Sequence, residues 1–385
     1  MKPLSLNDRL DVLSNKGVEL VDPRQIFVDE TVRLERIFPG CVLFPGTRLA
    51  GSNTLVAPGA LIGSEGPATV IDSAVGENAE IASGYVAGSV LLQKARIGSS
   101  GHVRAGTLLE EEASTAHAVG LKQTVLMSFV TLGSLINCCD CLISGGRSRS
   151  NHTEVGSGFI HFNFTPWGES GDKATPSLIG DVPKGVFLRQ ERIFLGGISG
   201  MIGPSRVGFG SLTVAGQVIR SDVPANRIHG EIQRHIDAPW DFQSRRPSGT
   251  RAEKNLEYIG HLAALRSWYI CIRKPRILLD GAAPSHLAMT IDAAIELLEG
   301  CISERWGRLG QFLGRDLGPV QLSATVSPLP VKPGSDSHLG WVKNLAKDEV
   351  SIGVAWLQEI VDTFVSAHRT QVLDGKTSSA APAAS

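Results

Sequence analysis

Four short stretches of this 385-residue chain hold residue types that could do chemistry. Cys138-Cys139-Asp140-Cys141 offers thiols to a metal ion, but structural zinc usually needs a second ligand pair at a distance. Neighbouring side chains alternate along a strand, so Cys138 and Cys139 would point apart; we interpret the run as buried small residues and predict no metal in the coil. Gly375-Lys376-Thr377 is similar to the end of a phosphate-binding loop, but Thr370 stands where the earlier glycine is required.

The other two stretches are basic and could hold an anion. Gly145-Gly146-Arg147-Ser148-Arg149-Ser150 offers backbone N–H groups and two arginines to a phosphate, or it is a mobile polar loop. Arg189-Gln190-Glu191-Arg192 is either a salt-bridged surface excursion or a ligand clamp. In the second interpretation it lies beside the loop 165–177, with Lys173 and Trp167 contributing.

The elements that would position these residues follow a period of six. The two series are Ile37, Leu43, Leu49, Leu55 and Leu61, and Leu195, Met201, Val207, Thr213 and Ile219. A period of six fits neither an α-helix nor a simple strand. It fits a solenoid with three flat faces per turn, in which each hexad residue points inwards. Pro39-Gly40, Pro45-Gly46 and Pro58-Gly59 stand where corners would fall, since Pro fixes φ and Gly accepts positive φ.

Composition narrows the classes of partner. The chain has 37 Lys and Arg against 38 Asp and Glu, a net charge of −1, so neither nucleic acid nor a membrane is an expected partner. The N-terminus lacks the apolar run of a signal peptide, and no stretch is expected to be long and apolar enough to span a bilayer. The six Cys show no secreted-domain framework, which favours free thiols in a cytoplasmic protein.

The pattern divides the chain into four regions. We predict a mainly β fold class: a short helix and linker (1–24), a left-handed parallel β-helix (25–225), a C-terminal α-helical domain (226–372) and a disordered tail (373–385). Three apolar stripes with helical spacing mark the helical domain. They are Leu256, Ile259 and Leu262; Leu287, Ile291, Ala294, Ile295 and Leu298; and Trp341, Leu345, Ile352, Trp356 and Ile360. These helices would pack on each other or the coil, or cap its open end.

The coil resembles the left-handed β-helix (hexapeptide-repeat) acyltransferase superfamily. In particular, it resembles the C-terminal acetyltransferase domain of the bifunctional N-acetylglucosamine-1-phosphate uridyltransferase/glucosamine-1-phosphate acetyltransferase. The stretch 17–29 is similar to that enzyme's junction between linker and coil, and the resemblance runs from about residue 15 to 225. It does not include the uridyltransferase domain. We expect the chain to start where that domain would end, which leaves pairing with a separate uridyltransferase polypeptide as one alternative.

The resemblance implies a set of site residues. Arg104 matches an arginine that grips the sugar phosphate, and Lys122 matches a lysine that contacts phosphate and uridyl. A forked guanidinium and a point charge together suit an anion. Asn163-Phe164 is similar to an Asn-Tyr pair at the contact between sugar and acetyl donor. Lys173 does not come from the resemblance: it is a further substrate contact only in the clamp interpretation of its loop. Later coils are implied to bind acetyl-CoA against backbone groups, through Gly196, Gly197 and Ala215.

One departure from the family concerns the catalytic base. The family uses a His, and an ungapped reading from Lys122 puts Ser134 in its place. A transferase that acetylates an amine needs a base, and a serine alone is a poor one. His161, two residues before Asn163, is the nearest candidate, so we hypothesise that it acts as the base; His152 and His117 are further candidates.

Two functions follow from the resemblance and its departures. The first is an acyl-CoA-dependent acyltransferase, with acetyl-CoA as donor, that acts on or binds a sugar phosphate or a nucleotide sugar related to UDP-N-acetylglucosamine. The alternative is a catalytically silent sugar-nucleotide binder or assembly scaffold, whose helical domain recruits a protein partner. The resemblance also implies a homotrimer with active sites between adjacent coils.

Overall fold

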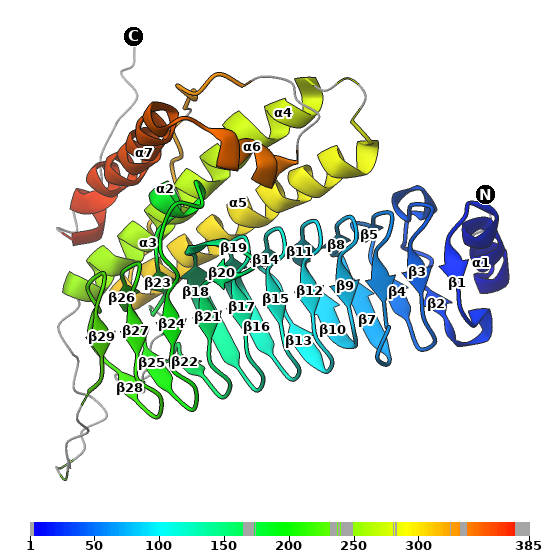
Figure 1. Ribbon diagram of the computed structural model, residues 1–385, viewed down its shortest axis with the longest axis horizontal. Helices are drawn as coiled ribbons and strands as arrows, with labels where there is room; N and C mark the ends of the chain where they lie inside the picture. The colour runs from blue at the N-terminus through cyan, green and yellow to red at the C-terminus, as the bar shows by residue number, and fades with distance from the viewer. Residues whose placement is uncertain are drawn as a thin grey trace.

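The computed structural model describes residues 4–164, 173, 175–231, 237, 239, 249–279, 281, 283–323, 325–331 and 337–373. About 11 turns of parallel strands form the left-handed β-helix that the hexads predict, and a helical region follows it. The helices lie along one side of the coil (Figure 1). Helix makes up 34% and strand 24% of the chain, and the predicted fold class is confirmed.

Each turn of the coil adds one short strand to each of three faces, which we call A, B and C in the order the chain visits them. Face A comprises β1 (Glu19–Leu20), β3 (Val42–Leu43), β6 (Leu61–Ile62), β9 (Glu80–Ile81), β12 (Arg96–Ile97), β15 (Ser114–Thr115), β17 (Thr131–Leu132), β21 (Glu154–Val155), β24 (Phe194–Leu195), β27 (Leu212–Thr213) and β29 (Ile228–His229). Face B comprises β2 (Phe27–Val28), β4 (Arg48–Ala50), β7 (Ala68–Ile71), β10 (Gly84–Ala87), β13 (Gly101–Val103), the first halves of β16 (Gly120–Leu126) and β18 (Asn137–Ile143), β22 (Ile160–Phe162), β25 (Gly200–Ile202) and β28 (Val218–Ile219). Face C comprises β5 (Leu55–Val56), β8 (Ala74–Val75), β11 (Ser89–Leu91), β14 (Thr107–Leu109), the second halves of β16 and β18, β23 (Ser177–Ile179) and β26 (Arg206–Val207).

The inward row of the coil follows most of the predicted hexads. All five residues of the second series are at most 2% exposed, and Ile37, Leu43 and Leu49 of the first are fully buried. Leu55 and Leu61 depart from the prediction: Val56 and Ile62 take the inward positions instead. The corner after Leu49 holds one more residue than a hexad allows, so Leu55 and Leu61 move to the other side of their strands.

Face C differs from the other two because its outward residues are also apolar. β11, β14 and β23 are buried at every position, whereas β12 on face A is buried only on its inward side. Strands buried on both sides read as continuous apolar runs. The outward residues of face C are Leu55, Ala74, Val90, Leu108, Val125, Leu142 and Leu178, and they pack in one cluster with the helices.

Within the described residues, five helices form the layer that covers face C: α3 (Gly249–Trp268), which continues through a π-turn at Tyr269–Arg273 into α4 (Lys274–Leu279), then α5 (Ser285–Leu313), α6 (His338–Asn344) and α7 (Lys347–Leu373). α5 contacts β8, β11 and β14, and α7 packs on α3. The short α2 (Val182–Gly185), between β23 and β24, contacts both α3 and α7. The layer therefore runs along the coil (Figure 1), alongside face C.

Two helix predictions need correction. The stripe predicted from 341 to 360 is two helices, because Leu345 leaves the helical conformation and the Glu349 carboxylate accepts the Ala346 N–H to begin α7. By length and composition alone, α7 would also qualify as a membrane span, which the sequence did not lead us to expect.

At the other end of the molecule α1 (Leu6–Asn15) covers the first turn of the coil with Leu10 and Leu13 (Figure 1).

A matched pair of leucines tests the helical cover. Leu108 and Leu61 both point outward from the coil, but Leu108 is fully buried under α5 and Leu61 is half-buried on face A. We expect Leu108→Ala to lower the free energy of unfolding by about 2–5 kcal/mol, because it opens a cavity under the helices. Leu61→Ala should cost about 1 kcal/mol or less. Urea denaturation measures both, and equal losses would contradict the cover.

Candidate functional site

Arg104 and Lys122 lie side by side where face B turns into face C. Val103 pairs with Leu121, and the Arg104 N–H donates to the Leu121 carbonyl at 2.9 Å. The two cationic side chains therefore leave adjacent strands, about 4.8 Å apart. The next strand places Cys139 beside Lys122, and Nη2 of Arg104 lies 3.6 Å from its Sγ. The structure thus brings together the two residues that the resemblance assigns to phosphate.

Asn163 lies further along the same B/C edge. Its Nδ2 donates to Oδ2 of Asp140 at 3.1 Å, and Oδ1 of Asp140 lies 3.2 Å from Nη2 of Arg305 on α5. Burial raises the pKa of the Asp140 carboxyl. Phe164 follows with 48% of its surface exposed. Lys173 is exposed as well, but Trp167 and most of the loop around it lie outside the described residues.

The opposite edge of face B, at its corner with face A, carries a ladder of polar side chains from three successive turns. Oγ of Ser134 lies 2.9 Å from Nδ1 of His117, and the Ser134 N–H donates to Oγ of Ser157 at 3.0 Å. His117 is exposed and Ser134 half-buried. An imidazole and a hydroxyl are therefore paired in reach of solvent at the A/B edge.

The residues predicted to hold acetyl-CoA lie at this same A/B edge, two and three turns beyond Ser134. The turns are closely stacked: a Cβ on Gly196 would lie 2.5 Å from the Ala215 nitrogen, and one on Gly156 would lie 2.4 Å from the Gly197 nitrogen. Side chains are excluded there, so the backbone itself forms the surface. Leu135 and Ile198, both at positive φ, stand exposed on either side of Gly158.

His161 takes an inward hexad position and not a surface one. It pairs with Met201 in the coil interior and is 3% exposed. Its Nδ1 lies 2.6 Å from the Cys139 carbonyl oxygen and its Nε2 lies 2.8 Å from Oγ of Ser177. Burial lowers the pKa of His161 to about 4. Both ring nitrogens are occupied away from solvent, so this geometry argues against the hypothesis that His161 is the base.

The partnership of His117 with Ser134 was missed by the sequence analysis, which named the two separately. The signal is their separation of 17 residues, which is the length of one turn here, since Thr115 pairs with Leu132. Residues one turn apart on a solenoid are spatial neighbours. A search for polar residues one turn apart, which here means 17 residues apart, would have found the pair.

The two basic stretches bind other parts of the chain. Gly145–Ser150 lies in a hairpin of β19 (Gly146–Ser148) and β20 (Asn151–His152), with Arg147 paired to Glu191 and Arg149 bonded to the Glu112 carbonyl at 2.6 Å. Arg189 donates to the Val342 and Lys343 carbonyls at the end of α6. These contacts favour the salt-bridged excursion over a ligand clamp.

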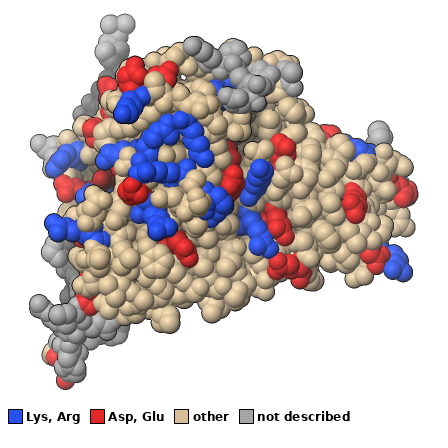
Figure 2. Space-filling view, viewed as in Figure 1, with Lys and Arg blue, Asp and Glu red and all other residues tan. Residues whose placement is uncertain are grey.

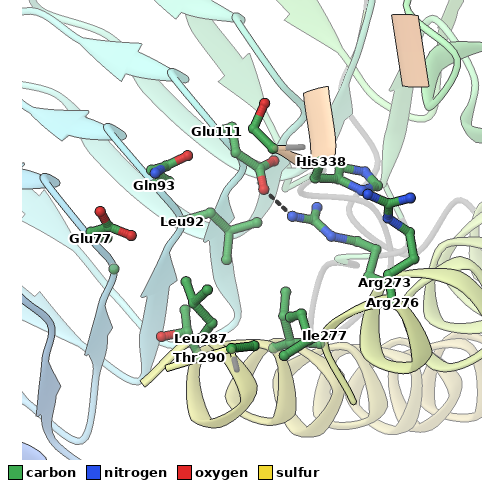
Figure 3. A pocket seen from close by; sticks show the side chains of 14 residues that line it. Glu77, Leu92, Gln93, Glu111, Arg273, Arg276, Ile277, Leu287, Thr290 and His338 are labelled. Atoms are coloured by element: carbon green, nitrogen blue, oxygen red, sulfur yellow. Dashed lines mark hydrogen bonds and ion pairs between the residues drawn. The ribbon is translucent and has the colours of Figure 1, made fainter. Parts of the chain in front are cut away.

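A cavity of about 320 Å³ lies between the A/C edge of the coil and the helices. Figure 3 shows Arg273 reaching from the helices to Glu111, with Arg276 and His338 beside it. The Tyr269 hydroxyl donates to Oε1 of Glu110 at 2.8 Å, and Glu110, Glu111 and Arg273 are each at most 6% exposed. This cluster is a joint that links the coil to the helical layer, and it is separated by face C from the B/C edge and by face A from the A/B edge.

The face of the molecule drawn in Figure 2 carries charges of both signs. Figure 2 shows much of the coil without charge in this view, with Lys and Arg gathered around the middle of the molecule beside acidic residues. Within the described residues, no three His, Cys, Asp or Glu side chains gather as a metal site.

Comparison with known proteins finds relatives that match 62–66% of this chain. The protein named bifunctional protein GlmU from Paenarthrobacter aurescens is 30% identical over 253 residues, which is 66% of this chain and 45% of that protein. Proteins of the same name from Pseudarthrobacter chlorophenolicus and Micrococcus luteus are each 30% identical, over 62% and 64% of this chain and 43% and 45% of theirs. The chain is related to GlmU.

This relationship confirms the resemblance drawn from the residues. The chain spans less than half the length of the GlmU proteins that it matches, and no protein-family model matches it.

Replacing His161 tests its role in the core. The unfolded chain takes up a proton near pH 6.5, whereas folded His161 resists protonation until about pH 4, so stability falls as the pH drops between these values. The difference corresponds to about 3 kcal/mol. We expect His161→Gln, which cannot titrate, to remove most of this loss. Urea denaturation at pH 7 and pH 4.5 measures it, with His102→Gln on the exposed face as control; an unchanged pH dependence would refute the assignment.

Replacing Arg273 tests the buried joint. Arg273→Met leaves Glu110 and Glu111 buried without their cation, which should lower the free energy of unfolding by about 3–5 kcal/mol. Adding Glu110→Gln and Glu111→Gln removes the uncompensated charge and should restore much of the loss. Thermal melts of the single and triple variants measure this, and a single variant as stable as the wild type would contradict the joint.

Proposed function

We propose that the chain transfers an acyl group from acetyl-CoA to a sugar phosphate or nucleotide sugar bound on face B. Arg104 and Lys122 hold the phosphate at the B/C edge, and Asn163 and Phe164 contact the sugar. Gly196, Gly197 and Ala215 receive the pantetheine arm at the A/B edge. Lys173 is a further substrate contact on its loop.

The observation that carries this proposal is the pairing of Arg104 with Lys122 on adjacent turns of an uncovered face. Two cations that leave adjacent strands repel each other, and a phosphate between them turns this repulsion into two charge-assisted contacts. The helical layer covers face C and leaves face B open for the acceptor.

The alternative is a silent sugar-nucleotide binder, and Ser134 at the family's base position favours it. In that case the same cations bind the ligand and no turnover follows. A cytoplasmic homotrimer, and a protein partner on the outer side of the helices, belong to both versions of the proposal.

A ligand panel with matched variants tests the proposal. Acetyl-CoA, glucosamine 1-phosphate, N-acetylglucosamine 1-phosphate and UDP-N-acetylglucosamine would each be added to the purified chain, since a ligand that binds only the folded state raises the melting temperature. We expect a shift with acetyl-CoA and with at least one sugar compound. Arg104→Met and Lys122→Met should each weaken sugar-phosphate binding by roughly tenfold to a hundredfold, the effect of losing one charge-assisted hydrogen bond.

Lys94→Met is the matched control, because Lys94 is an exposed cation at the A/C edge. The affinity of the Lys94→Met variant for the sugar compounds should equal that of the wild type. Shifts with the sugar compounds alone would support the silent binder, and no shift with any of the four would overturn both versions.

A further inference from the structure

We infer that His117 is the general base of this site, taking the place of the histidine that the family carries at position 134. The inference rests on the proposed acyl transfer. The bond between Ser134 and His117 holds the imidazole against the very residue that has replaced the family's base.

The position of the ring supports this exchange. His117 and Ser134 sit at equivalent places on adjacent turns, about one strand spacing apart. Nδ1 of His117 approaches Oγ of Ser134 to 2.9 Å, so the imidazole leans over the short serine side chain. An imidazole is therefore present at the A/B edge even though the chain's residue 134 is a serine.

The hydrogen bond engages Nδ1 of His117 and leaves Nε2 as the candidate reactive nitrogen. When Nδ1 carries the proton and donates it to the Ser134 hydroxyl, Nε2 is left with a free lone pair. The Ser134 N–H is in turn bound to Oγ of Ser157, which fixes the backbone under the hydroxyl. Ser134 is thus a positioning residue, and Nε2 of the exposed His117 is the atom that can accept a proton.

Other described histidines near face B are less suited. His161 is enclosed in the coil with both nitrogens bonded. His152 bonds the Arg149 carbonyl from the hairpin, away from the A/B edge. His102 stacks on Tyr85 with ring centroids 5.2 Å apart. His117 alone of these four stands beside Ser134 and the closely stacked turns at Gly196 and Gly197.

The chemical step balances with His117 as base. The acceptor's amine nitrogen attacks the thioester carbonyl carbon, a C–N bond forms and the C–S bond breaks. Nε2 of His117 takes the proton that the nitrogen loses, and then returns it to the departing thiolate. The products are the amide and free coenzyme A thiol, and no oxidant or further reactant is needed. The amine must lie near the A/B edge while the phosphate stays on Arg104 and Lys122.

The test follows thiol release from acetyl-CoA with glucosamine 1-phosphate as acceptor. We expect His117→Ala to lower kcat by roughly a hundredfold to ten-thousandfold with little change in KM, since positioned proton transfer contributes about that much. Ser134→Ala, which only frees the ring, should cost less. The double variant His117→Ala with Ser134→His returns an imidazole to the family's position and should recover activity over His117→Ala alone. His152→Ala is the control and should match the wild type.

The outcomes separate this inference from the proposed function. Full turnover in His117→Ala would overturn the inference and leave the transferase standing. Loss of turnover only together with the folded state, seen as a lower melting temperature, would also overturn it. A wild-type chain that binds the ligands but releases no thiol would overturn both the inference and the transferase. Loss of kcat in a stable His117→Ala variant, with recovery by Ser134→His, would support it.

Discussion

The apolar outward row of face C decides which surfaces of this coil can meet a ligand. A solenoid strand usually buries one side only, but Val90, Leu108 and Val125 point outward and are nearly or fully buried. Fully burying one such side chain is worth about 1.5–3 kcal/mol, so the row strongly favours a cover over exposure to water. Once α5 lies there, only faces A and B remain open, and the paired cations and the His117–Ser134 pair both border face B.

Buried ion pairs then determine where along the coil the cover lies. Apolar contacts have little directional preference, so the helices could slide along a uniform row. Arg273 reaches Glu111 at the A/C edge and Arg305 reaches Asp140 at the B/C edge. Because an unpaired buried charge is costly, a shifted register would break both contacts. The second of them also links α5 to Asn163, so the helical layer supports one end of the proposed acceptor site.

The coil could be predicted from sequence because its period is unlike that of any other common element. The inward row could not be followed by counting sixes, since one extra corner residue moved Leu55 and Leu61 to the other side. The cover was in principle visible in pairs such as Leu108-Leu109, where both neighbours are apolar. The second series, Leu195 to Ile219, contains no such extra residue, and all five of its predicted inward residues lie inside the coil.

The candidate site was harder to predict because its parts lie on different turns. Arg104 and Lys122 came from the family resemblance and proved to be neighbours. His161 was chosen for its closeness to Asn163 in sequence, yet it stands six residues after the inward Val155 and so continues the inward row of hexad positions. A histidine at such a position is a core residue. To identify His117, one must know which residues on neighbouring turns are paired. Hydrogen bonds between strands define this pairing, and residue types alone do not.

The length of α5 has a consequence for how this molecule comes apart. An array in which each turn touches only its neighbours can fray from its ends one turn at a time. α5 has 29 residues and is about 43 Å long, which equals roughly nine strand spacings. Arg305 bonds α5 to the coil near one end of the helix, and buried apolar contacts hold it near the other end. One continuous helix therefore holds several turns of the coil together. The turns beneath it should therefore open together, as one cooperative block, while those outside it can still unwind singly.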